Sequence, residues 1–225
     1  MVKQERAVRT RAAVVAAASA EFARAGYDGT SLSRISRLAG MSVGALTFHF
    51  RTKRELADAV QEEGRSVTLA ALDVLSPRGR PALLQVVELT LELARLMEEE
   101  SAVRAAIRLG RERPGTVSWS RAWLPAVHGL LDEAYAAGQL RESARTADVV
   151  TLVEHLTDSA EVYLRGRGAD ESELGNAVAR LRLIWKLVLT GVSAGGVCPG
   201  QPALLVLGSD APSPASRPAA PEPTA

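Results

Sequence analysis

One short set of side chains, between residues 42 and 50, has the types and the spacing to contact another molecule. Ser42 is placed to cap a helix there, because its hydroxyl can accept from a backbone N–H two or three residues later. Leu46 and Phe50 are four residues apart, so they share one face of that helix and can pack inward. The remaining face carries a glycine and four side chains suited to base edges or phosphates: Val43, Gly44, Thr47, Phe48 and His49.

The residues before Ser42 predict a partner helix joined to this one by a tight turn. Thr30 or Ser31 can cap the partner helix, and Gly40 can end it in the left-handed conformation. Its apolar positions, expected to pack on the inward face of the second helix, are Leu32, Ile35, Leu38 and Ala39. Two helices crossing in this way form the helix-turn-helix that lays its outer face in the major groove of DNA.

Each residue on the outer face has a DNA interpretation and a plainer alternative. Phe48 can contact a thymine methyl, and Ser42, His49 and Lys53 can reach phosphates. Gly44 would let the backbone approach a phosphate strand, since a glycine inside a helix costs roughly 1 kcal/mol and usually has a reason. The alternatives are a core aromatic for Phe48, an exposed histidine without a partner for His49, and a helix-glycine-helix passage that binds no DNA.

Positive charge is concentrated around this candidate motif. Residues 1–53 hold nine Lys and Arg against three acidic residues, a net charge of +6, whereas the whole chain carries +1. A basic surface beside a helix-turn-helix is the electrostatic pattern expected for phosphate contact. Arg6, Arg9 and Arg11, near the start of the first predicted helix, are expected to reach the DNA backbone. The alternative is a solvated basic surface.

The composition predicts an all-α protein. Hydrophobic residues make up 47% of the 225 residues and aromatics only 4%, so Ala, Val and Leu must build the core, which favours packed helices. The single cysteine, Cys198, gives no disulfide and no metal-ligand spacing. Neither a signal peptide nor a membrane span is expected, which favours a cytoplasmic protein. Without a phosphate loop, a nucleophile elbow or an acid–base pair, we expect neither an enzyme nor a cofactor.

Caps, breaks and apolar periodicity divide the chain into helices. Thr52 and Glu55 form a capping box, and Pro81 suits the first turn of a later helix. The first helix is expected to bury a stripe of Val8, Ala12, Val15, Ala18 and Phe22. The predicted helices cover 3–25, 30–39, 42–50, 52–75, 81–100, a short stretch through Val103 and Ile107 to near Gly110, 118–137, 146–165, and 171–191, the last opening with a capping box at 170–173.

The last two long helices are apolar over wider faces than one neighbour would cover. We therefore expect them to form a homodimer interface, a four-helix arrangement across a two-fold axis with Trp185 on its stripe. Beyond them the composition changes, because seven of the eleven prolines lie in residues 199–225. Most of that tail is expected to be disordered.

The first quarter of the chain resembles the signature of TetR-type transcriptional repressors. The matching residues are Thr30, Ile35, Ala39, Gly40, Met41, Ser42, Gly44, Phe48, His49, Phe50, Lys53 and Leu56. Within that family, residues 44–50 and 4–11 are most similar to gamma-butyrolactone autoregulator receptors and their pseudo-receptor relatives, which control antibiotic production. The resemblance departs at two positions, since the family commonly has Lys where this chain has Val43 and Tyr where it has Thr47.

The resemblance implies a domain organisation and a mechanism. Residues 1–51 would form the DNA-binding domain, 52–198 a helical effector-binding and dimerisation domain, and 199–225 the tail. The homodimer would bind double-stranded DNA at a pseudo-palindromic operator and release it when a small autoregulator enters each C-terminal domain. The helix beginning at Thr52 is the expected lever between the two domains.

Four residues are candidates for the effector pocket. Trp123 is the first choice because a large flat ring can cover a lactone or furan, and Trp119 shares its helical face. Thr157 can orient a ligand carbonyl or hydroxyl, and Val127 completes the set. Core packing is the alternative for the tryptophans, and a bond to its own helix is the alternative for Thr157. The acidic and histidine cluster Glu154, His155, Asp158 and Glu161 has helical spacing but indicates a solvated face more than a metal site.

The main hypothesis is therefore a one-component repressor that couples effector binding to DNA release. One rival is a TetR-type regulator of efflux or catabolic genes that answers to another lipophilic ligand. A rival from a different class is a helical protein-interaction module without a DNA role. A steep inverse dependence of DNA affinity on salt would separate this last class from the other two.

Overall fold

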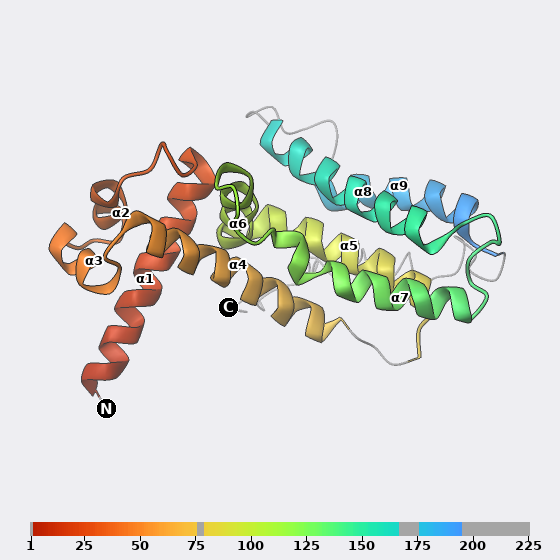
Figure 1. Ribbon diagram of the computed structural model, residues 1–225, viewed down its shortest axis with the longest axis horizontal. Helices are drawn as coiled ribbons and strands as arrows, with labels where there is room; N and C mark the ends of the chain where they lie inside the picture. The colour runs from red at the N-terminus through yellow and green to blue at the C-terminus, as the bar shows by residue number, and fades with distance from the viewer. Residues whose placement is uncertain (1, 76–78, 167–175, 195–225) are drawn as a thin grey trace, which may run out of the picture.

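The computed structural model describes residues 2–75, 79–166 and 176–194 of the chain, all arranged as helices and short connections (Figure 1). Within these residues there is no named β-strand, and the all-α prediction is confirmed. The expected tail at 199–225, Cys198 and the capping box at 170–173 lie outside the described residues. The helices are α1 (Val2–Ala25), α2 (Leu32–Leu38), α3 (Val43–His49), α4 (Lys53–Val74), α5 (Ala82–Glu99), α6 (Ser101–Glu112), the 3₁₀ helix η1 (Trp119–Ala122), α7 (Leu124–Ala136), α8 (Thr146–Gly166) and α9 (Ala177–Val192).

Helices α1, α2 and α3 form a small head at one end of the molecule (Figure 1). The expected caps are present: Ser31 Oγ accepts from the Arg34 N–H and Ser42 Oγ from the Ala45 N–H, each at 3.2 Å. Gly40 has φ +67°, the left-handed conformation that ends α2. The fully buried centre of the head includes Phe22, Ile35, Leu46 and Phe50.

Two expectations about the head core are wrong. Leu38 is 56% exposed, because α2 ends at this residue and the turn to α3 carries its side chain off the buried face. Val8 is 64% exposed and Ala12 is also exposed, because the N-terminal half of α1 extends beyond the helices that cover its second half (Figure 1). The predicted stripe is therefore buried only from Val15 onward.

Helix α4 joins the head to the larger helical body. Thr52 caps it by accepting from the Glu55 N–H at 3.0 Å, while the Glu55 carboxylate accepts from the Arg51 N–H instead of the Thr52 N–H of a full capping box. Its first half buries Leu56 in the head core. Its second half packs Val67 and Leu72 against the core of the body, so one rigid helix contacts both.

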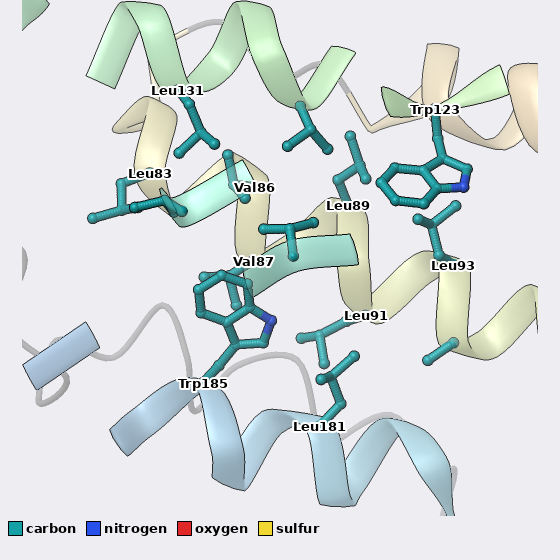
Figure 2. Close-up of a cluster of buried hydrophobic side chains, with 14 of the residues drawn as sticks. Leu83, Val86, Val87, Leu89, Leu91, Leu93, Trp123, Leu131, Leu181 and Trp185 are labelled. Carbon is teal, nitrogen blue, oxygen red and sulfur yellow. The ribbon is translucent and has the colours of Figure 1, made fainter. Parts of the chain in front are cut away.

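The body is built around α5, which is buried on nearly all sides by α4, α7, α8 and α9. Figure 2 shows Trp123 directed toward Leu93 of this helix, and Trp185 of α9 directed toward Val87 and Leu91. Trp185 is fully buried, and its indole N–H donates to Thr90 Oγ1 at 2.7 Å. The expectation that Trp185 lies on a dimer stripe is therefore wrong: the ring supplies the core of its own chain.

The segment predicted as one helix over 118–137 consists of two. A 3₁₀ turn, η1, ends at Ala122, and α7 begins at Leu124 with Pro125 in its first turn. A proline has no N–H and its ring clashes with the carbonyl four residues earlier, so a continuous helix could not pass through this point. The break places Trp119 and Trp123 on a bend, and their ring centroids lie 5.9 Å apart.

Helices α8 and α9 cover one side of the body, with their outer faces uncovered in this chain (Figure 1). Large apolar side chains on those faces are exposed: Val162, Leu183 and Leu187. Helix α9 begins at Ala177, with Asn176 as its N-cap. The sequence predicted a start at residue 171. None of the helices in the described ranges is long and apolar enough to cross a membrane.

Candidate functional site

The outer face of α3 projects into solvent as the sequence predicted. Phe48 is 85% exposed and Val43 42% exposed, whereas Leu46 on the opposite side is completely buried. Phe48 contacts the neighbouring His49 edge to face, with ring centroids 5.5 Å apart. The alternative of a core aromatic is therefore wrong for Phe48. Adding a Cβ at Gly44 would meet little, since only the Ser42 hydroxyl lies as near as 4.0 Å.

Lys53 has a role that the sequence did not reveal. Its ammonium donates to the backbone carbonyls of Tyr27 and Thr30 at 2.9 and 3.1 Å and lies 4.3 Å from the centre of the Tyr27 ring. It therefore ties the start of α4 to the loop between α1 and α2. Because an ammonium carries three donors, one remains available for a phosphate.

Exposed cations surround α3 on neighbouring elements. Arg6 and Arg9 lie on the exposed start of α1, and Arg37, Arg51 and Arg54 flank the helix-turn-helix. In the described part of the chain none of these five has an ion-pair partner within 4 Å. They are free to contact an anionic ligand, which is the requirement for neutralising phosphates.

Two other arginines of the head are used internally. Arg24 and Arg34 both pair with Glu21, whose side chain is only 2% exposed, at 2.7 and 2.6 Å. The hydrogen bond from Arg24 outweighs the cost of burial and, with that from Arg34, holds the pKa of Glu21 below its usual value. This triad fixes α2 against α1; the Glu21–Arg24 pair has helical spacing, whereas the contribution of Arg34 depends on how the two helices cross.

A second candidate site is a pocket of about 270 Å³ between α6, η1, the start of α7 and α8. Three of the four predicted effector residues line it, namely Trp119, Trp123 and Thr157. Val127 does not line it, because it faces inward from α7 and is fully buried in the core of the body. The other lining residues are Ile107, Gly110, Arg111, Ser118, Ser120, Glu154 and Asp158.

The two pocket tryptophans differ in what their N–H groups do. Trp119 donates to Thr68 Oγ1 at 2.8 Å, which anchors η1 on α4. The Trp123 N–H is buried and has no acceptor among the described residues. A buried donor without a partner costs about 1–3 kcal/mol, so this N–H would gain from any acceptor that reached it. Thr157 donates to the Val153 carbonyl at 2.9 Å, the expected alternative, and its oxygen can still accept.

The charged groups at the pocket form ion pairs between α6 and α8. Arg111 donates to Glu161 at 2.5 Å and lies 3.6 Å from Asp158. His155 interacts instead with the Thr151 carbonyl, at 2.8 Å from its Nδ1. Across the described ranges, no group of three or more potential ligands is arranged to hold a metal ion.

Helix α6 lies between this pocket and the head. Its pocket side carries Gly110 and Arg111, while on its other side Arg108 donates to the carbonyls of Ala23 and Arg24 at 3.1 and 2.9 Å. These carbonyls belong to the last turn of α1, where acceptors are free and a cation is favoured. Glu112, one turn after Arg108, accepts from its Nε at 2.7 Å and from the Tyr27 N–H at 2.5 Å. Burial disfavours the charged form of Glu112, but the bonds from Arg108 and Tyr27 outweigh it and lower its pKa.

The end of α6 is also fastened to α4. Arg113 is nearly buried, and its guanidinium donates to Asp58 at 2.6 Å and to Gln61 at 2.7 Å. Gly64 marks the closest approach of the two helices, because a Cβ there would lie 2.6 Å from both the Ala102 carbonyl oxygen and the Ala106 Cβ. Sequence reasoning missed the hydrogen bonds of Arg108 to α1 and of Arg113 to α4, since their partners lie 52 to 85 residues apart in the chain.

Comparisons with known proteins cover both the head and the body of the chain. The family model "Bacterial regulatory proteins, tetR family" matches residues 14–60, which span the second half of α1, the helix-turn-helix and the start of α4. The A-factor receptor protein of Streptomyces griseus is 32% identical over 143 residues, which cover 62% of this chain. The chain spans about half the length of that protein, 49%.

Solved structures extend the similarity over most of the chain. A gamma-butyrolactone receptor (ArpA-like protein) is 27% identical, covering 84% of this chain and 89% of its own, with a TM-score of 0.66. CprB from Streptomyces coelicolor, solved in complex with its biological operator sequence, is 30% identical over 83% of this chain and 90% of its own, with the same TM-score of 0.66. From its helix-turn-helix, its helical body and these similarities, we conclude that the chain belongs to the TetR family of bacterial regulatory proteins.

Proposed function

We propose that the chain is a ligand-responsive repressor that binds operator DNA with its head and releases it when a small effector occupies the pocket at Trp119 and Trp123. The observation that carries the proposal is the position of α6. One side of this helix lines the pocket, and its other side holds the last turn of α1 through Arg108 and the start of α4 through the Arg113 that follows it. A ligand that moves α6 must therefore act on the head.

DNA contact is assigned to the outer face of α3 and to the cations around it. Val43, Gly44, Thr47, Phe48 and His49 would enter the major groove, and Ser42 and the third donor of Lys53 would contact phosphates. The exposed Arg6 and Arg9 on α1 would reach the flanking backbone. The operator complex of CprB, a relative over most of its length, supports this assignment.

The effector is proposed to be a compact oxygen-bearing compound such as a gamma-butyrolactone or furan. A lactone carbonyl could accept from the unpartnered Trp123 N–H while the two indole rings cover its apolar part. The similarity to a gamma-butyrolactone receptor and to the A-factor receptor protein supports this class. A further solved structure, 28% identical and described as the molecular basis for control of antibiotic production by bacterial hormones, supports the proposal that the chain controls genes of antibiotic production, acting in the cytoplasm where bacterial DNA lies.

The working form is proposed to be a homodimer joined through α8 and α9. The exposed Val162, Leu183 and Leu187 form the apolar surface that a second copy would cover. Two heads related by a two-fold axis would match the two half-sites of a pseudo-palindrome, about one helical turn apart. A small change in the separation of the heads is then enough to lose one half-site.

The proposal is tested by fluorescence-anisotropy binding to the DNA upstream of the chain's own gene, with random DNA as the control. Titration with butyrolactones, furans and antibiotics follows. We expect specific binding that falls steeply with salt and is reversed by a compound of one of these classes. Equal affinity for random DNA would contradict the DNA assignment, and specific binding that an efflux substrate reverses would place the chain among regulators of efflux genes.

A further inference from the structure

We infer that α3 distinguishes operator sequences by the C5-methyl groups of thymine, which Phe48 and Val43 contact in the major groove, and not by hydrogen bonds to guanine. The inference rests on the proposed binding of operator DNA and specifies how that site reads sequence. Three features of the described residues lead to it. They are the apolar side chains exposed on the outer face of α3, here called the reading face, the hydrogen bond that the Thr47 hydroxyl on this face already donates, and the positions of the cations without ion pairs.

The first feature is the apolar character of the reading face. Phe48 leaves 85% of its surface in water and Val43 leaves 42%, although both lie on a seven-residue helix otherwise well packed on its inner side. Among the rings of the described residues, Phe48 contacts that of His49, which it meets at its edge. Burying such side chains against apolar groups of a partner lowers the free energy, because apolar surface is removed from water. In the major groove the only apolar group on a base edge is the thymine methyl.

The second feature is the hydroxyl of Thr47, which faces the same side as Val43. It donates to the carbonyl of Gly44 at 3.1 Å, so its single proton is used within the helix. Among the side chains of α3, the ring of His49 is then the one that still offers a donor, and a single imidazole edge does not supply the pair of donors with which Arg or Lys reads guanine. Guanine offers the groove two acceptors and is usually read by two donors of Arg or Lys, which the sequence of α3 lacks.

The third feature is that the cations lie on the elements around α3. Arg37 lies in the last turn of α2, Arg51 in the turn after α3, and Arg54 in the first turn of α4. All three are exposed and, within the described part of the chain, form no ion pair. In this arrangement the cations on the neighbouring elements contact phosphates, and the apolar side chains of α3 contact the bases.

The test uses duplexes enriched from a randomised library by binding to the full chain. The selected operator is resynthesised with deoxyuridine in place of each thymidine in turn, which removes only the C5-methyl group. We expect about a fourfold loss of affinity for each methyl that Phe48 or Val43 covers, the loss that corresponds to one methylene-sized group returned to water. Symmetric replacement in both half-sites should cost about 15-fold.

A double-mutant comparison assigns the effect to the side chain. In Phe48→Ala, thymidine and deoxyuridine operators should bind with equal affinity at the contacted positions, because the ring that covers the methyl is absent. Val74→Ala is the matched control: Val74 is 86% exposed at the far end of α4, and its variant should keep the full deoxyuridine penalty. Since 85% of the Phe48 surface is exposed, its replacement should leave the thermal midpoint unchanged.

The outcomes separate this inference from the proposed function beneath it. Specific binding that is insensitive to deoxyuridine at every position would overturn methyl reading while leaving the repressor proposal standing. A deoxyuridine penalty that persists in both Phe48→Ala and Val43→Ala would also overturn it, because the methyl would then act through DNA shape. Failure to enrich any sequence would overturn both.

Discussion

The Arg108 guanidinium on α6 donates to the backbone carbonyl of Arg24, in the last turn of α1, across 2.9 Å. The two residues are 84 positions apart, and this contact joins the helix that lines the pocket to the helix that supports the DNA-reading motif. The contact is a physical connection for the proposed coupling. A substitution at Arg108 removes it without changing a residue assigned to either site.

Replacing Arg108 with Ala should uncouple the two sites. The variant should bind operator and effector, but the effector should weaken DNA binding less than in the parent, where coupling of about 1–3 kcal/mol is expected. Anisotropy with and without saturating effector measures the ratio. Arg65→Ala is the control, because Arg65 pairs only with Glu62 on the exposed side of α4; equal uncoupling in both variants would exclude a specific role for Arg108.

Trp123→Phe should weaken effector binding while preserving DNA binding. The change removes the unpartnered N–H but keeps an aromatic ring in the buried site, so the loss is that of one hydrogen bond, about 0.5–1.5 kcal/mol. Isothermal titration should show affinity reduced about three- to tenfold. Trp119→Phe should cost stability instead, since its N–H already bonds Thr68. Unchanged effector affinity in Trp123→Phe would mean that the indole N–H does not contact the ligand.

Two glycine-to-alanine changes should move stability in opposite directions. A Cβ at Gly64 would lie 2.6 Å from the Ala102 carbonyl oxygen, which is backbone and cannot yield, so Gly64→Ala should cost about 1–3 kcal/mol. Gly129 lies exposed within α7 with open space around it, so Gly129→Ala should stabilise by about 0.5–1 kcal/mol. Urea unfolding measures both, and a Gly64→Ala variant as stable as the parent would show that α4 and α6 separate easily.

Acid should loosen the attachment of α6 to the head. The pKa of Glu112 is lowered in the folded chain, so its bonds to Arg108 and Tyr27 stabilise the fold above its ordinary pKa of 4.5 and are lost as the pH falls through the lowered value. Glu112→Gln should be less stable than the parent at pH 7, and the difference should shrink toward pH 3. Urea midpoints at the two pH values test this, and a difference that grows on acidification would contradict the assignment.

The proposed dimer is tested on the outer face of α9. Leu187 is 76% exposed, so Leu187→Glu should fold normally yet place a charge in the interface that a second copy would cover. Sedimentation should show the parent as a dimer and the variant as a monomer with much weaker operator binding. Val74→Glu, with a similarly exposed position on α4, should remain dimeric.

Local signals in the sequence predicted the local structure well. Ser31, Gly40 and Ser42 mark the helix-turn-helix because caps and left-handed turns depend on residues within three positions. Trp119 and Trp123 were paired by helical spacing and do share the pocket, even though Pro125 divides the predicted helix between η1 and α7.

Features that depend on distant contacts could not be predicted in this way. Trp185 has the same spacing whether it faces a second copy or its own core, and only the position of Thr90 on α5 decides between them. Leu38 is apolar and periodic but lies at the last residue of α2, beyond the reach of the head core. The ion pairs that Arg111 of α6 makes with Asp158 and Glu161 of α8 depend on which charged residues the fold brings together, and their sequence positions gave no indication of it.

The most direct test of the account is a closed binding cycle on the full chain with its operator and its effector. DNA affinity is measured by anisotropy with and without saturating effector, and effector affinity by tryptophan fluorescence with and without saturating operator. We predict that each ligand weakens the other by the same factor, between about 5 and 150, because coupling between two sites is reciprocal. An effector that binds at Trp123 and leaves the operator affinity unchanged would contradict the central claim that α6 connects the pocket to the head.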